Sequence, residues 1–178
     1  MNVKPSTKPG EVLVRLNEKD EALMSRGRDL LIPFQRILVP VDFSDCSKEA
    51  LRCAVPFARH FGATLLVLHV VQPNYPADPC LVSQYEQFES SLIDSSKSWL
   101  EKMVRAGVPP EVPSQTVIRT GHPATEIVRV AAEMRADVIF ISTHGYTGIK
   151  HVVFGSTAEN VVRHSPCPVL TMRARATN

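Results

Sequence analysis

The feature that most constrains this sequence is a buried strand that runs directly into a glycine-bearing turn. Residues 138–141 read Val-Ile-Phe-Ile, and such a run of β-branched and aromatic side chains is typical of a strand covered on both faces in a parallel sheet. A polar stretch follows, in which Gly145 and Gly148 can adopt positive φ, so that backbone N–H groups can converge on an anion. The segment predicts a strand of an α/β sheet that ends at a binding turn.

A second candidate anion site follows the turn. Gly155 and Ser156 precede a segment with helical spacing of apolar residues, so we expect Ser156 to be the N-cap of a helix. The free N–H groups and the positive end of the helix dipole would attract an anion. A strand end, a glycine turn and a helix N-terminus together make a phosphate cradle at the carboxyl edge of a parallel sheet. Glycine density alone leaves ordinary turns an equally good interpretation.

The rest of the chain alternates between apolar runs typical of buried strands and segments with the apolar spacing of helices. Apolar runs predict strands, which we place at residues 36–41, 64–71, 112–120, 138–141 and 169–172. Amphipathic segments predict helices, which we place from Ser44 to Gly62, over 83–106, from Pro123 onward and up to about His164. The aromatic residues of 83–106, Trp99 among them, are expected to pack in the core. This alternation indicates an α/β fold, a doubly wound five-stranded parallel sheet with helices on both faces and right-handed crossovers.

Composition and charge exclude several classes of function. The net charge is only +2, the basic residues are scattered, and 6% of residues are aromatic, so a nucleic-acid surface is not expected. No apolar run approaches the roughly 18 residues that span a membrane, and no compact signal core is evident, so we expect a cytoplasmic protein without a membrane contact. The four cysteines lack metal-ligand spacing. Cys46 and Cys53 would lie roughly 10 Å apart on one helix, so free thiols are predicted.

The length of 178 residues suits one domain of about 140 residues with an extension. We place an N-terminal extension at residues 1–35, the domain at 36–173 and a tail at 174–178. The extension combines prolines with a weak amphipathic segment between Leu16 and Leu31. We expect it to be partly disordered, with room for one short helix.

Five short motifs occur in one order along the chain: PVDFS at 40–44, LHVV at 68–71, GHP at 121–123, the glycine loop that ends at 155–156, and SPCPV at 165–169. On these motifs, residues 36–171 resemble a universal stress protein domain of the nucleotide-binding branch. The loop of that branch reads Gly, two residues, Gly, nine residues, then Gly and Ser or Thr. Gly145, Gly155 and Ser156 match it, whereas its first glycine is Ser142 here, which adds a Cβ where the backbone approaches the ligand.

The resemblance implies the strand order 3-2-1-4-5, a fold like that of the adenine nucleotide alpha hydrolases, and a site for ATP, or AMP or ADP. Mg²⁺ or Mn²⁺ would be bound through the phosphates. Adenosine would lie against Pro40, Val41, Asp42 and the backbone of Val70. The ribose and inner phosphates would follow Ser142, Thr143, His144, Gly145, Tyr146, Thr147 and Gly148. The outer phosphates would bind Gly155, Ser156, Thr157 and Ala158. From the residues alone, Asp42 is equally a turn carboxylate or a ligand.

No catalytic residue is predicted. Phosphoryl transfer needs positioned charge, and the sequence has neither a lysine after a Walker-type loop nor paired carboxylates near the site. We therefore expect an ATP-binding regulatory switch or sensor of the stress response, with at most slow or partner-dependent hydrolysis. Similar proteins pair the last strand across a two-fold axis, which implies a homodimer, and a regulatory protein partner of unknown identity is expected.

Two alternatives remain open. In the first, the chain is a nucleotide-free dimeric module of the same fold that binds a partner, and Ser142 marks a lost site. In the second, Cys46 or Cys167 senses redox state.

Overall fold

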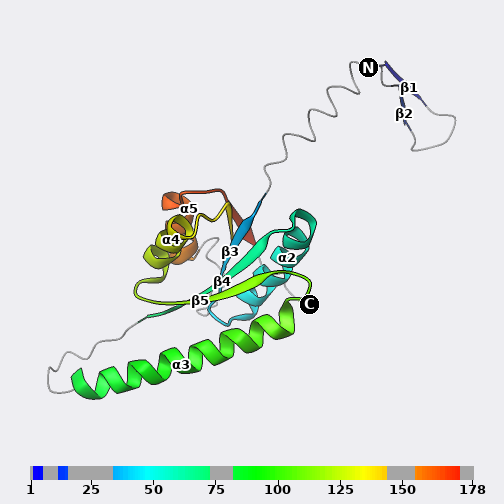
Figure 1. Ribbon diagram of the computed structural model, residues 1–178. Helices are drawn as coiled ribbons and strands as arrows, with labels where there is room; N and C mark the ends of the chain where they lie inside the picture. Colours follow the sequence, from blue (N-terminus) through cyan, green and yellow to red (C-terminus); the bar gives the residue numbers. More distant parts are fainter. Residues whose placement is uncertain (1, 6–11, 16–33, 73–81, 144–154, 173–178) are drawn as a thin grey trace. The chain divides into compact units, whose positions relative to one another are not determined.

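The computed structural model describes residues 2–5, 12–15, 34–72, 82–143 and 155–172 (Figure 1). The chain divides into two compact units, Met1–Pro33 and Phe34–Asn178. In the first unit, β1 (Asn2–Pro5) pairs antiparallel with β2 (Val12–Arg15). The sequence analysis did not suggest these two strands. The short helix considered between Leu16 and Leu31 lies outside the described residues.

The second unit is built on a five-stranded parallel sheet. Its strands are β3 (Arg36–Pro40), β4 (Thr64–Val71), β5 (Ser114–Thr120), β6 (Val138–Ser142) and β7 (Val169–Met172). They lie in the order β5-β4-β3-β6-β7, and each neighbouring pair is parallel. Numbered along this unit the order is 3-2-1-4-5, so the predicted topology is confirmed.

Within the described residues, four helices cover the two faces of this sheet. They are α2 (Asp45–Phe61), α3 (Val82–Gly107), α4 (Pro123–Glu133) and α5 (Ser156–His164). Along β3, Ile37 and Val39 belong to the core beneath α2 and α3, whereas Leu38 belongs to the core beneath α4 and α5. Figure 1 shows α4 and α5 together on one side of the sheet and α2 on the other. Because successive side chains of a strand point to opposite faces, an uninterrupted apolar run fills both cores.

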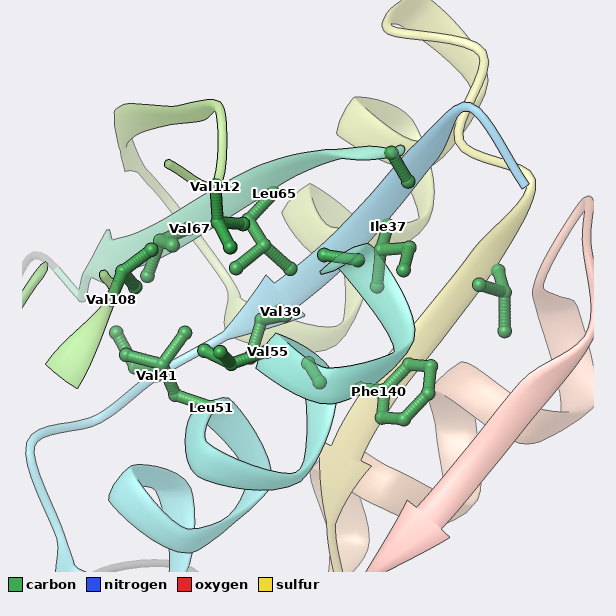
Figure 2. Packing of buried hydrophobic residues seen from close by; sticks show 14 of the residues in the cluster. Ile37, Val39, Val41, Leu51, Val55, Leu65, Val67, Val108, Val112 and Phe140 are labelled. Atoms are coloured by element: carbon green, nitrogen blue, oxygen red, sulfur yellow. The ribbon is translucent and has the colours of Figure 1, made fainter. Parts of the chain in front are cut away.

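The core beneath α2 and α3 is shown in Figure 2. Ile37, Val39 and Leu65 from the strands meet Leu51 from α2, and all are at most 1% exposed. Phe140 of β6 is fully buried there. Burying a side chain of this size contributes about 1.5–3 kcal/mol, so this layer fixes the strands whose ends carry the site.

The ends of α2 agree with the sequence analysis. The Ser44 side chain accepts a hydrogen bond from the Ser47 amide at 3.2 Å. At the other end, Gly62 has φ 65°, in the left-handed region that favours glycine, and its amide bonds to the Ala58 carbonyl. Both predicted caps are therefore present.

Two local predictions were wrong. The N-cap of α5 is Gly155, and Ser156 is the first helical residue, because a contact between Gly155 and the end of β6 turns the chain one residue earlier than expected. Trp99 is 60% exposed and not in the core, since its neighbour Leu100 takes the buried position on α3.

Candidate functional site

A cavity of about 370 Å³ opens at the carboxyl edge of the sheet. Its walls come from the ends of β3, β4 and β6 and from the first turns of α2, α4 and α5. From β3 the chain continues to β4 on one side, whereas β6 leads to β7 on the other, so β3 and β6 flank the switch point at which such sheets bind ligands. The volume lies in the range of small-molecule sites.

The structure brings together the described residues of the predicted site. All ten of them line this cavity: Pro40, Val41, Asp42, Val70, Ser142, Thr143, Gly155, Ser156, Thr157 and Ala158. The remaining five predicted residues, His144, Gly145, Tyr146, Thr147 and Gly148, lie outside the described residues. Segments that are more than a hundred residues apart in sequence therefore form one concave surface.

Thr143 and Gly155 form the base of the site. The Gly155 amide donates a hydrogen bond to the Thr143 carbonyl at 2.7 Å, and the Thr143 amide donates one to the Met172 carbonyl at 2.8 Å. A Cβ at Gly155 would lie 3.2 Å from the Thr143 oxygen, which is too close for comfortable packing. With φ −71°, the backbone of Gly155 is ordinary. Close approach, and not backbone conformation, is therefore what favours glycine here.

The first turn of α5 faces the cavity with backbone donors. In any α-helix the first N–H groups lack an acceptor within the helix and carry the positive end of the dipole. The N-cap Gly155 has no side chain that could accept from them, and Ser156 and Thr157 add hydroxyl groups. This turn is suited to bind an anion.

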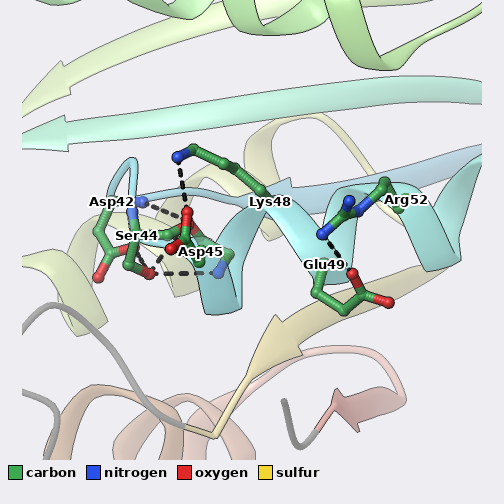
Figure 3. Close-up of polar contacts among 7 residues, drawn as sticks. Asp42, Ser44, Asp45, Lys48, Glu49 and Arg52 are labelled. Atoms are coloured by element: carbon green, nitrogen blue, oxygen red, sulfur yellow. Dashed lines mark hydrogen bonds and ion pairs between the residues drawn. The ribbon is translucent and has the colours of Figure 1, made fainter. Parts of the chain in front are cut away.

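Asp42 both stabilises the turn after β3 and lines the cavity. One carboxylate oxygen, Oδ1, accepts hydrogen bonds from the Ser44 amide at 3.1 Å and the Ser44 hydroxyl at 2.5 Å (Figure 3). The Asp42 amide donates to the Ser47 hydroxyl at 3.3 Å. The two interpretations that the sequence left open for Asp42, turn carboxylate and cavity residue, are compatible in this geometry.

His69 contacts the backbone of Val41, one of the residues that line the cavity. Its Nδ1 lies 2.8 Å from the Val41 carbonyl, which can only accept, so Nδ1 carries the proton. Burial lowers the pKa of this imidazole, and neither the bond to Val41 nor the charge of Asp42 offsets that effect. His69 is absent from the cavity lining. It has the structural role that a histidine inside a strand most often has.

The sequence analysis missed several lining residues: Ser47, Leu68, Gln72, Pro123, Ile127 and Ile141. Strand alternation could have found one of them, because Leu68 lies two residues before Val70 on the same face of β4, whereas Gln72 follows the end of the strand. The α4 residues carry no comparable signal, since their position depends on how the helix packs over the sheet.

Among the residues that the structure describes, no group of three or more His, Cys, Asp or Glu side chains is arranged to hold a metal ion. Within the same residues, no helix is both long and apolar enough to cross a membrane.

Comparisons with known proteins agree with this architecture. The model of the universal stress protein family matches residues 33–173. A universal stress protein of Methanocaldococcus jannaschii is 31% identical over 152 residues, which cover 85% of this chain and 88% of the relative. Among solved structures, UspA from Lactobacillus plantarum aligns with a TM-score of 0.66 at 29% identity over 79% of this chain and 98% of its own.

Two further structures share the fold and contain ligands. One is a universal stress protein in complex with cAMP, with a TM-score of 0.52 and 22% identity over 79% of this chain and 98% of its own. The other is a universal stress protein from Archaeoglobus fulgidus in complex with dAMP, with a TM-score of 0.54 and 24% identity over the same shares. At these identities the likeness establishes the fold alone.

Proposed function

Because the chain belongs to the universal stress protein family, we propose that its cavity binds an adenine nucleotide and that the protein acts as a nucleotide-dependent switch or sensor in the stress response. The observation that carries the proposal is the convergence of the cavity lining. Residues from the ends of three strands and from the first turn of α5 surround one hollow of about 370 Å³. The ligands of the cAMP and dAMP complexes guide the choice of nucleotide through the shared fold.

One end of the cavity is lined by apolar side chains and the other by backbone amides and hydroxyl groups, which suggests how the nucleotide would be oriented. The base would lie against Pro40, Val41 and Val70, near the apolar side chains of Leu68 and Ile127. Asp42 would accept a hydrogen bond from the base or a ribose hydroxyl. The phosphates would extend toward the amides and hydroxyls of residues 155–158, where the dipole of α5 favours negative charge.

ATP is the proposed ligand, with AMP or ADP as alternatives that share its base and ribose. Mg²⁺ or Mn²⁺ would be bound through the phosphates, since Mg²⁺ is commonly held by substrate phosphates and water. The Ser142 side chain lies at the end of β6 on the cavity wall. It would contact the ribose or the first phosphate where the family loop has glycine.

The proposed role is binding and signalling, with at most slow or partner-dependent hydrolysis. We also propose a cytoplasmic homodimer that recruits a regulatory protein. The last strand, β7, lies at the edge of the sheet, and its Leu170 is 38% exposed. Pairing β7 with β7 of a second subunit would provide hydrogen-bond partners for the backbone groups at that edge.

The test combines mass spectrometry of nucleotide released from the purified protein with calorimetric titration of ATP and AMP, with and without Mg²⁺. We expect saturable binding, and a loss of about tenfold or more in affinity for Gly155→Asp, which places a carboxylate against Thr143 and the phosphate path. Val162→Asp adds the same charge at an exposed position further along α5, outside the cavity, and should bind ATP like the wild type.

Absence of saturable binding by the wild type would refute the proposal and favour the alternative of a nucleotide-free dimeric module. Equal losses in both variants would instead show a general charge effect, which would also contradict the proposed phosphate path.

A further inference from the structure

A second hollow lies between α2 and α3, and it shares no lining residue with the cavity. We call it the α2–α3 groove. It has a volume of about 530 Å³ and is lined by Phe43, Lys48, Leu51, Arg52, Trp99, Lys102, Met103, Ala106 and Gly107. The proposed nucleotide site therefore does not account for this groove.

The groove has an aromatic and aliphatic floor. Trp99 is 60% exposed, the most exposed of the large apolar side chains that the structure describes. Its ring lies edge-to-face with Phe43, with 5.8 Å between centroids, and Leu51 and Met103 continue the floor. An exposed tryptophan held in place by a second ring is preorganised for contact, and tryptophan is enriched among the residues that dominate binding energy at interfaces.

Basic side chains line both sides of the groove. Lys48 and Arg52 are one turn apart on α2, and Lys102 belongs to α3. Lys48 pairs with Asp45 at 2.8 Å and Arg52 with Glu49 at 2.6 Å (Figure 3). These ion pairs are exposed, and such pairs are worth about 0–1 kcal/mol. A ligand's carboxylates can therefore replace the intramolecular partners at little cost.

We propose that the α2–α3 groove binds an amphipathic helix of a partner protein, with an apolar ridge flanked on both sides by carboxylates. The ridge would lie on Trp99 and Phe43, and the carboxylates would meet Lys48 and Arg52 on one wall and Lys102 on the other. A helix laid lengthwise between two helices, anchored by residues spaced three and four apart, is an established mode of recognition. The distribution of charge selects this occupant, since a ligand with a single anionic group would use only one wall.

The inference does not depend on nucleotide binding, and its test uses the full chain. Two fluorescein-labelled helical peptides carry the same leucine ridge, one with glutamates and the other with lysines on the flanks. Fluorescence anisotropy should show saturable binding of the acidic peptide, at least about tenfold tighter than the basic one, and weaker binding as salt rises. Trp99 is the only tryptophan of the chain, so a blue shift of its emission reports burial of the floor.

Variants locate the binding. Lys102→Glu and Arg52→Glu should each lower the affinity for the acidic peptide about tenfold. Trp99→Ala should lower this affinity as well, and the protein should still fold because the Trp99 ring is exposed. Arg105→Glu is the matched control, since Arg105 is exposed on the same helix and is not part of the groove lining.

Several results would overturn the proposal: equal affinity for both peptides, no binding up to about 1 mM, or equal losses in Lys102→Glu and Arg105→Glu. Preferential binding of decanoate or of anionic vesicles over the acidic peptide would also overturn it. So would a loss of self-association in Trp99→Ala, measured by sedimentation, because that result would assign the groove to a second copy of the chain.

Discussion

Asp42 and Phe43 are consecutive residues whose side chains line different hollows, Asp42 the cavity at the carboxyl edge of the sheet and Phe43 the α2–α3 groove. Phe43 has φ 64°, a left-handed backbone that few residues other than glycine adopt. Its ring lies 4.3 Å from the His69 ring and 5.8 Å from that of Trp99, centroid to centroid. These contacts offset the backbone strain, so the turn that presents Asp42 is stabilised by packing in the groove.

A pair of substitutions separates the strain of Phe43 from its ring contacts. Phe43→Ala removes the ring and retains the strain, whereas Phe43→Gly removes both. Since a left-handed residue costs roughly 1–2 kcal/mol unless it is glycine, the glycine variant should be more stable than the alanine variant by about 1 kcal/mol. Urea unfolding measures the free energy of unfolding of the two variants. An alanine variant as stable as the glycine variant would show that the left-handed backbone is not strained.

Glycine-to-alanine changes at two positions should differ in their effect on stability. Gly155→Ala brings a Cβ to 3.2 Å from the Thr143 carbonyl, which is fixed by its own hydrogen bond to Gly155, and should cost about 1 kcal/mol or more. Gly107→Ala meets only the Leu51 Cδ2 atom, at 3.7 Å, and should be neutral or slightly stabilising in a helix. Thermal unfolding of the two variants provides the comparison. Similar stabilities would contradict the close approach at the base of the site.

His69 should make stability depend on pH. Its folded pKa is lowered by burial, so the folded state binds fewer protons than the unfolded state in the window below about 6.5, the ordinary pKa of histidine. The contribution is therefore fully present above that value and is lost as pH falls through the folded pKa. Unfolding in urea at about pH 7.5 and pH 5.5 should show a smaller loss for His69→Gln than for the wild type. An identical loss would assign the dependence to other groups.

The proposed homodimer can be tested at the edge of the sheet. Leu170→Lys places a charge on β7, where Leu170 is 38% exposed, and should shift sedimentation toward the monomer. Trp99→Lys removes an exposed apolar side chain from α3, which packs near the opposite edge of the sheet, and should leave the dimer intact. A wild-type monomer at micromolar concentration would contradict this assembly.

The sheet could be predicted from the sequence because its strands are local patterns. The apolar runs of β3, β4 and β6 have no polar face, and this alone indicates a sheet covered on both sides. The α2 cap at Ser44 was also predictable, since a serine side chain makes its own bond to the helix. The strand order and the adenosine contacts came from the family resemblance, whereas the glycine turn and the anion site at Gly155 and Ser156 were predicted from the residues themselves.

What the sequence could not predict depends on contacts between distant segments. Gly155 replaces Ser156 as N-cap because its amide bonds to Thr143, twelve positions earlier in the chain. Trp99 is exposed because α3 packs on the sheet through Leu100, and helical spacing does not distinguish these neighbours. The turn of Phe43 likewise depends on rings from β4 and α3.

The hydrogen bond between Thr143 and Gly155 has a consequence for the variation of this fold. These two residues precede and follow positions 144–154 in the sequence, and Thr143 is also hydrogen-bonded to Met172 at the end of the last strand. Because the entropy of closing a loop grows slowly with its length, the span between these anchors can be shortened, extended or exchanged for another at small cost. Selection, or a designer, could therefore change the sequence and length between Thr143 and Gly155 while the five-stranded sheet stays the same.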